Sequence, residues 1–159
     1  MKRINNILTH DGYITYLNKI RDAEKNRPFC KHGLQHFFDV ARIGYIFVLE
    51  RNLSIDKETI YAAALLHDIG RWREYKDGTD HALVSGDIAK EILRDCKFGE
   101  KEIKHIVQAI KLHRNKNKLY TQLDKVLYES DKVSRPCISC GSRDKCKRFA
   151  NGEKVKFFV

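Results

Sequence analysis

Apolar residues recur every three or four positions along most of the chain, the spacing that gives a helix one buried face. Residues 33–51 carry the broadest such stripe, formed by Leu34, Phe37, Phe38, Ala41, Tyr45 and Val48. The same spacing predicts further helices over residues 11–25, 56–68, 80–93, 100–112 and 121–134. No stretch alternates apolar and polar residues over the length of a strand, so the pattern predicts an all-α bundle of about six helices.

The helix predicted over residues 56–68 is apolar on all sides of its middle, from Ala62 to Leu66, which indicates a central, buried position. Asp56 is a candidate N-cap for this helix, and Gly70 is a candidate stop. Residues 71–80 are polar and include Gly78, and we expect them to form a loop of about ten residues. A loop of that length is often functional.

Length and composition predict one helical domain with an appendage. With 159 residues the chain can bury a single core, which we assign to residues 1–135. Residues 136–159 are small, polar, basic and Cys-containing, and we treat them as a tail. The chain has no run of about 18 apolar residues, and its short polar N-terminus lacks the apolar core of a signal peptide. We therefore expect a cytoplasmic protein without a membrane span.

The formal net charge is +10, and the basic residues are unevenly spread. Residues 103–123 contain no acid, and residues 132–159 contain eight basic residues against two acids. Such a balance favours solubility and also attracts an anionic partner, either a phosphorylated small molecule or a nucleic acid.

The pair His67-Asp68 ends the apolar run, where burial requires partners for both side chains. Alone, the pair would be interpreted as a cap that bonds local backbone. His36 on the polar edge of an earlier apolar helix and Asp131 on a late helix change this interpretation, and His32 lies four residues before His36. The two His and two Asp can converge into a mixed N/O site for Fe, Mn, Co, Ni or Zn, which would leave positions open for water and phosphate oxygens.

The order His36, His67-Asp68, Asp131, with ALLHDIGR around the pair and QHFFDVAR around the first His, resembles the HD-domain phosphohydrolase superfamily. The resemblance covers about residues 30 to 135. It implies a helical fold and a metal bound by these four residues. It also implies hydrolysis of phosphomonoester, phosphodiester or phosphoanhydride bonds, usually in nucleotides.

The resemblance extends to two later histidines. His81 opens a helix after the predicted loop and His113 ends the next helix, so by themselves they would be a helix cap and a residue favoured by the helix dipole. In binuclear members, histidines in matching places hold a second metal that Asp68 would bridge. That subgroup includes bacterial enzymes that split symmetrical dinucleoside tetraphosphates. Many of its members have Thr after the fourth His, where this chain has Arg114. This departure bears on which substrate is bound more than on the metal ligands.

Arg71 follows the His-Asp pair closely, and a guanidinium is the natural bidentate partner of a phosphate. We therefore consider Arg71 and Arg114 as phosphate-binding residues, and Asp68 and Arg71 as catalytic ones. An exposed cation near a helix end would explain Arg71 equally well. The candidates for a general acid in the same segment are Glu74, Asp77 and Asp80.

Three cysteines crowd into the tail as Cys137, Cys140 and Cys146. In a reducing compartment such thiols indicate a metal-binding or redox role in preference to disulfide bonds. A structural zinc site has four ligands and an iron–sulfur cluster needs four thiolates, so the fourth must come from Cys30, Cys96 or a His. Cys30 is favoured because it lies just before the helix of the first His ligand, while Cys137 follows the last Asp ligand. The alternative is a reduced tail without metal.

The sequence therefore predicts a metal-dependent phosphohydrolase that cleaves a phosphoester or phosphoanhydride bond by metal-activated water. The expected substrate is a nucleotide or another small phosphorylated metabolite, and the expected cofactors are one or two transition-metal ions. One alternative is a nucleic-acid-binding module with a zinc-binding basic tail, supported by the charge but by no RNA-stacking aromatic motif. Another is a regulatory HD scaffold, against which the intact four-residue set argues.

Overall fold

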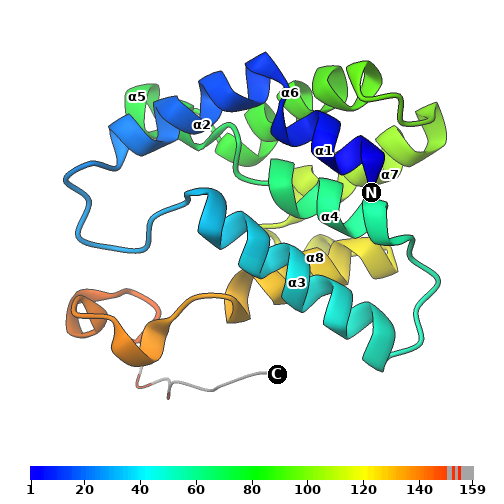
Figure 1. The fold of residues 1–159 in the computed structure, drawn as a ribbon. Coiled ribbons are helices and arrows are strands. Elements are labelled where there is room, and N and C mark those ends of the chain that lie inside the picture. Colours follow the sequence, from blue (N-terminus) through cyan, green and yellow to red (C-terminus); the bar gives the residue numbers. More distant parts are fainter. Residues whose placement is uncertain (150–151, 153, 155–159) are drawn as a thin grey trace.

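The computed structural model describes residues 1–149, 152 and 154 and shows an all-helical fold (Figure 1). The α-helices within these residues are α1 (Lys2–Leu8), α2 (Asp11–Ala23), α3 (Leu34–Glu50), α4 (Lys57–Leu66), α5 (Arg71–Asp77), α6 (His81–Asp95), α7 (Glu100–Leu112) and α8 (Gln122–Val133). Three short 3₁₀ helices accompany them, namely η1 (Lys116–Lys118), η2 (Cys137–Ser139) and η3 (Arg143–Lys145). Since this part of the chain contains no strand, the predicted all-α class is confirmed.

Helix α4 lies at the centre of the bundle, as its apolar sequence predicts (Figure 1). All five side chains from Ala62 to Leu66 are fully buried, and α4 packs against α1, α3, α6, α7 and α8. The Asp56 carboxylate accepts hydrogen bonds from the backbone N–H groups of Glu58 and Thr59, so the predicted N-cap is confirmed. Because neighbours surround α4, the residues at its C-terminal end are held in the interior.

Helix α1 is an addition to the predicted set, in a segment too short for its periodicity to be informative. Ile4 and Ile7 are buried and contact the core that α4 centres. Arg3 binds Glu58 on α4 and Glu102 on α7, with N–O distances of 2.5 and 2.9 Å. Burial of two isoleucines and these ion pairs stabilise a helix of seven residues, which would be marginal alone.

The predicted loop over residues 71–80 is wrong, because most of it forms helix α5. No side chain of α5 is fully buried, so the sequence shows no apolar stripe there. Tertiary contacts hold the helix instead: α5 packs on α2 and α6, and the Trp72 ring stacks on Tyr16 with centroids 6.2 Å apart. The helix ends at Gly78, whose φ of 77° lies in the left-handed region that glycine adopts readily.

Gly70 allows the turn between α4 and α5 to lie directly on α6. A Cβ at this position would stand 2.6 Å from the backbone N of Ser85 and 2.9 Å from Cβ of Val84, closer than side chains pack. The Gly70 N–H also donates a hydrogen bond to Oγ of Ser85, at 2.9 Å. The first turns of α6 are therefore fixed beside the C-terminal end of α4.

The tail leaves α8 and turns toward the link between α2 and α3, beside which it lies in Figure 1. The Ser142 hydroxyl donates to the carbonyl of Pro28 at 2.6 Å, and Arg148 donates to the carbonyl of Lys132 at 2.7 Å. These two contacts tie the tail to both the α2–α3 link and α8. No helix in the described part of the chain is long and apolar enough to cross a membrane.

Candidate metal centre

The ends of several helices meet at one buried point and bring six of the predicted ligands together. His36 lies in the first turn of α3, His67 and Asp68 follow α4, His81 begins α6, His113 ends α7, and Asp131 lies on α8. All of these except His36 are at most 2% exposed. Helices α3, α6, α7 and α8 all pack on α4, and each brings one of its ends to the C-terminal end of α4.

The first ligand group joins His36, His67 and Asp68, whose ligand atoms all lie within 4.8 Å of one another. The His67 Nε2 is 3.5 Å from Oδ2 of Asp68 and 3.8 Å from Oδ1 of Asp131. The His36 Nε2 is 3.4 Å from the same Asp131 oxygen. Two imidazoles and two carboxylates thus face one small space.

The second group joins Asp68, His81 and His113 under the same 4.8 Å limit. Oδ1 of Asp68 is 2.8 Å from Nε2 of His81 and 3.4 Å from Nε2 of His113. Asp68 therefore directs Oδ2 toward the first group and Oδ1 toward the second. One carboxylate between two sets of imidazoles is suited to bridging two ions.

Backbone carbonyls orient the rings. Nδ1 of His67 lies 2.7 Å from the carbonyl of Ala64, and Nδ1 of His113 lies 2.6 Å from the carbonyl of Ile110. Since a carbonyl only accepts, each Nδ1 carries the proton and each Nε2 presents a lone pair to the centre. This is the arrangement that metal-binding histidines commonly have.

The donor atoms fit a metal. Nε2 of both His36 and His67 is buried without a hydrogen bond, and a buried polar atom left unpaired costs about 1–3 kcal/mol. Burial alone would raise the pKa of Asp68, but His67, His113 and His81 hold that pKa well below its ordinary value. The pKa of Asp131 is likewise held low against burial, by His36, His67 and the cation of Arg135. Two carboxylates and the lone pairs of imidazoles form a ligand set for a divalent transition metal.

A family model for the HD domain matches residues 33–135, a range that contains all six of the residues that face the centre. The chain belongs to the HD domain family. Its His67-Asp68 pair lies at the centre just described.

Relatives of this HD-domain chain differ in length. A protein of Clostridium beijerinckii is 48% identical over 147 residues, covering 92% of both chains. Ribonuclease Y of Salinispora arenicola is 31% identical over 67% of this chain but only 16% of its own length. Ribonuclease Y of Nitratidesulfovibrio vulgaris is 30% identical over 79% of this chain and 22% of its own length. The chain thus spans a small part of the ribonuclease Y proteins that it matches.

A solved structure supports the family at the level of the fold. A predicted HD superfamily hydrolase from an uncultured Thermotogales bacterium superimposes with a TM-score of 0.60 and 28% identity. The superposition covers 76% of this chain and 66% of that one. The HD-domain chain therefore has the fold of the HD hydrolase superfamily.

A residue that sequence reasoning missed, Glu24, lies at the edge of the HD centre. Its carboxylate contacts Nδ1 of His32 at 2.5 Å and accepts the His32 backbone N–H at 2.6 Å. Nε2 of His32 is buried without a hydrogen bond, 3.8 Å from Oδ2 of Asp68. Glu24 stands in a polar stretch after α2, so nothing in the local pattern marks it as buried.

The predicted phosphate-binding residues differ in their distance from the centre. Nη1 of Arg71 lies 3.0 Å from Nε2 of His81 and 3.8 Å from Oδ1 of Asp68, and its side chain is 19% exposed. Arg114 lies farther out at 45% exposure, paired with Glu74 and Asp80 at 3.4 Å each. Arg71 is therefore part of the centre, whereas Arg114 lies at its rim.

Of the three acids considered for proton transfer, Glu74 lies nearest to the HD centre. It contacts Nδ1 of His81 and pairs with Arg114. Asp77 instead bonds Arg73 and Thr79, and Asp80 accepts the backbone N–H of Ala82 at the start of α6. Asp77 therefore stabilises the C-terminal end of α5, and Asp80 caps the N-terminal end of α6.

Two cations of α8 and its C-terminal end were also missed. Nζ of Lys132 lies 2.6 Å from Oδ2 of Asp131, and Nη2 of Arg135 lies 3.0 Å from its Oδ1. Arg135 follows Asp131 by four residues, the spacing at which helical side chains meet. This four-residue spacing is the feature of the sequence that could have identified Arg135 as a partner of Asp131.

A cavity of about 290 Å³ opens at His36. Its walls come from the α2–α3 link, the start of α3 and the tail, and include Cys30, Cys137 and Cys140. Cys96 is buried in the core instead, and Cys146 is partly buried in the tail. Within the described residues, only His and Asp side chains form groups of three ligand atoms within 4.8 Å of one another.

Proposed function

We propose that the chain is a metal-dependent phosphohydrolase that cleaves a phosphoester or phosphoanhydride bond of a nucleotide or another small phosphorylated metabolite. The observation that carries this proposal is the Asp68 carboxylate between two sets of histidines, with Oδ1 2.8 Å from His81 and Oδ2 3.5 Å from His67. This geometry supports two neighbouring divalent ions bridged by one residue. Paired ions are a common device for displacement at phosphorus.

His36, His67, Asp68 and Asp131 would hold one ion, and Asp68, His81 and His113 the other. Bound there, divalent ions supply Lewis acidity toward phosphoryl oxygens and make water more acidic. Asp68 and Asp131 remain anionic because the surrounding His, Arg and Lys groups hold the pKa of each carboxyl low. Both are therefore ready to coordinate at neutral pH.

The chain's own cations would bind and orient the substrate. Arg71 is partly exposed and lies next to both His81 and Asp68, so its guanidinium can donate to phosphate oxygens beside the ions. Its Nε bonds the Tyr75 hydroxyl at 3.1 Å, which limits the rotation of the side chain. Glu74 lies next to His81. Burial acts to raise the pKa of its carboxyl, but His81, Arg71 and Arg114 hold that pKa below the ordinary value. Glu74 would therefore serve as a carboxylate partner of His81 and not as the proton donor to the leaving group.

The test is a phosphate-release screen over nucleotides with protein loaded with Mn²⁺, Fe²⁺, Co²⁺, Ni²⁺ or Zn²⁺. We expect one class of nucleotide to be hydrolysed and Asp68→Asn to abolish its hydrolysis. Asp22→Asn is the matched control, since Asp22 is an exposed carboxylate that pairs with its neighbour Arg21. Loaded protein that hydrolyses no phosphorylated compound would overturn the proposal and favour a regulatory HD scaffold.

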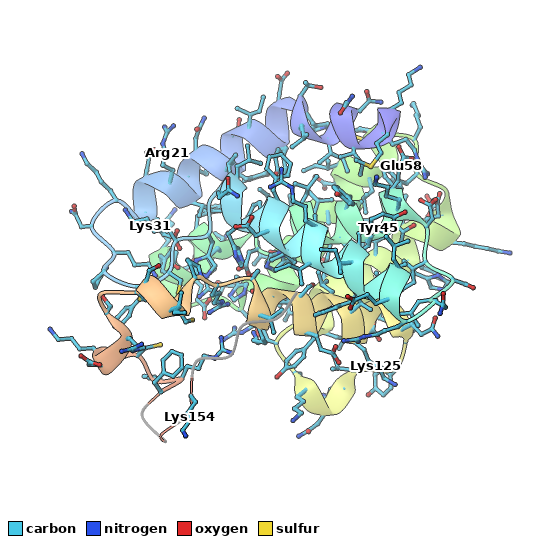
Figure 2. All side chains as sticks on the ribbon, turned by 60° about the horizontal axis from the view of Figure 1, so that its bottom comes forward. Arg21, Lys31, Tyr45, Glu58, Lys125 and Lys154 are labelled. Carbon is cyan, nitrogen blue, oxygen red and sulfur yellow. The ribbon has the colours of Figure 1, made fainter. Side chains whose placement is uncertain are left out.

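A second candidate function is the binding of a polynucleotide, and a basic groove on the outer side of α8 favours it. This groove has a volume of about 810 Å³. Its cationic residues are Arg51, Lys116, Lys125, Lys132, Arg135 and Arg148, with Glu129 as the acid among its lining residues. Lys125 marks the side of the molecule away from α2 in Figure 2. The similarity to ribonuclease Y also supports this candidate.

Salt dependence separates the two functions. A polynucleotide bound by the groove releases counterions, so its affinity would fall steeply as salt rises. Lys116→Gln combined with Lys125→Gln should reduce this slope, and Lys2→Gln combined with Lys101→Gln, on the exposed surface outside the groove, should not. Equal binding of oligonucleotide by both double variants would exclude the groove as the binding surface.

A further inference from the structure

Thiols from two distant parts of the chain share one cavity. Cys30 comes from the link between α2 and α3, whereas Cys137 and Cys140 come from the tail beyond α8. All three are free and partly buried. Cysteines placed by unrelated segments around one space can act as a single set of ligands.

The tail segment is folded in tight turns that suit metal binding. The Cys137-x-x-Cys140 unit forms a 3₁₀ turn, with the N–H of Cys140 3.4 Å from the carbonyl of Cys137. A second turn follows, and the N–H of Cys146 bonds the carbonyl of Arg143 at 3.0 Å. Pairs of cysteines with two residues between them are common in structural zinc sites, because one turn directs both sulfurs to one side.

Arg148 joins the second turn of the tail to Cys137. Its Nη1 lies 3.9 Å from Sγ of Cys137 and donates to the carbonyl of Lys132. Cys146, two residues before Arg148, is partly buried in the same tail but does not line the cavity. Ser142, between the two turns, bonds Pro28, which is two residues before Cys30.

The thiols also interact electrostatically. Burial raises the pKa of the Cys137 thiol, Cys30 and Cys140 raise it further, and Arg148 and Arg135 act against the rise. Neighbouring thiolates would repel one another, whereas a cation between them removes that repulsion. Binding a soft metal would thus release protons from these thiols.

We propose that Cys30, Cys137, Cys140 and Cys146 bind one zinc ion that clips the tail onto the α2–α3 link at the opening beside His36. Four thiolates form a closed tetrahedral set, which gives zinc a structural role with no position open for water. None of the four is engaged in a disulfide and none is fully buried. Within the described residues no three of their sulfurs lie within 4.8 Å of one another, so the cysteine side chains would have to move together to bind the ion. This site is separate from the His/Asp centre and does not depend on the proposed hydrolysis.

The zinc clip would also shape the opening of the His/Asp centre. Arg135 stands between the two sites, bonding Asp131 on one side and lining the cavity with Cys137 and Cys140 on the other. Fixing the tail would therefore hold Arg135 in place. Loss of the zinc should change substrate affinity more than the rate of the chemical step.

Full-length protein loaded with Co²⁺ provides the test. We expect a thiolate-to-cobalt charge-transfer band, which the His/Asp centre cannot produce because it contains no thiolate. Cys30→Ser and Cys137→Ser should each weaken or abolish that band. Cys96→Ser is the matched control, because Cys96 is buried in the core away from the cavity, and it should retain the band.

Zinc analysis and proteolysis complete the test. A mercurial thiol reagent should release one zinc ion per chain from the wild type and from Asp68→Asn, but none from Cys137→Ser. Trypsin should cut the tail at Arg143, Lys145 and Lys147 faster in Cys137→Ser than in Cys96→Ser. Absence of a thiolate–cobalt band from the wild type would overturn the proposal, as would a Cys30→Ser variant with full zinc. If the purified protein contains iron and inorganic sulfide, the cysteines hold an iron–sulfur cluster and the zinc proposal is overturned.

Discussion

Nδ1 of His32 lies 2.5 Å from Oε1 of Glu24, and both side chains are only 2% exposed. The Tyr75 hydroxyl donates to the same oxygen at 2.6 Å, so Glu24 is satisfied on several sides. These bonds fix the imidazole with Nε2 toward Asp68, 3.8 Å from Oδ2. The pair thus links the end of α2 to the His/Asp centre.

Glu24→Gln should weaken the centre without unfolding the protein. An amide holds the His32 ring less firmly than a carboxylate, and loss of such an outer contact typically costs about 10–100-fold in metal affinity or activity. Titration with Mn²⁺ followed by metal analysis measures the effect on affinity. Glu50→Gln, at an exposed helix end, is the control and should behave like the wild type. Unchanged metal affinity and turnover in Glu24→Gln would show that the His32 orientation has no part in the centre.

His36→Ala and His81→Ala should separate the two ions. His36 belongs to the group with His67, whereas His81 belongs to the group with His113. We expect each variant to lose mainly the ion of its own group and Asp68→Asn to lose both, because Asp68 belongs to both groups. Metal content after dialysis measures this directly. If His81→Ala keeps the full metal content of the wild type, the centre holds a single ion.

Gly70→Ala should destabilise the fold by about 1–3 kcal/mol, as insertion of a methyl group into packed structure usually does. The new Cβ would stand 2.6 Å from backbone at Ser85, which cannot move away as a flexible side chain could. Urea unfolding measures the difference. Gly33→Ala is the control, since no atom lies within 4 Å of its Cβ, and it should change the free energy of unfolding by under about 1 kcal/mol. Equal stability of the two variants would contradict the close packing of Gly70.

Arg3→Gln should reduce stability at neutral pH by about 0.5–1 kcal/mol, a value that allows for solvent screening of these partly exposed pairs. Bonding to Arg3 lowers the pKa of Glu102 from its ordinary value of 4.5. A lowered carboxyl pKa stabilises the fold above the unfolded pKa, and this stabilisation is lost as pH falls through the folded one. The gap between variant and wild type should therefore be full near pH 7 and shrink below about pH 4.5.

Unfolding curves over that pH range, at low and high salt, check the effect of Arg3. Arg21→Gln is the control, because Arg21 is largely exposed and pairs with the equally exposed Asp22 beside it in the sequence. A gap that stays constant down to pH 3 would assign the effect of Arg3 to its packing over Phe98 instead of its charge.

Long apolar repeats made most of the fold predictable. The helix predicted over residues 100–112 has the same bounds as α7, and the predicted N-cap Asp56 begins α4. Helix α5 was missed because it buries no side chain fully, and α1 because seven residues hold too few apolar positions. A periodic pattern reports burial along one helix, so helices held by a few tertiary contacts leave no such pattern.

The ligand types of the centre were determined by the sequence itself, through His36, the His67-Asp68 pair and the apolar runs that place them at helix ends. Only the tertiary structure decided how they divide, with Asp68 shared by two groups of imidazoles. It also decided that Glu24 is buried against His32, and that Cys30 faces the cavity of Cys137 and Cys140 while Cys96 enters the core. The physical reason is that helical geometry fixes the direction of a side chain from its own neighbours, whereas contacts between helices depend on crossing angles and turns set by the whole core.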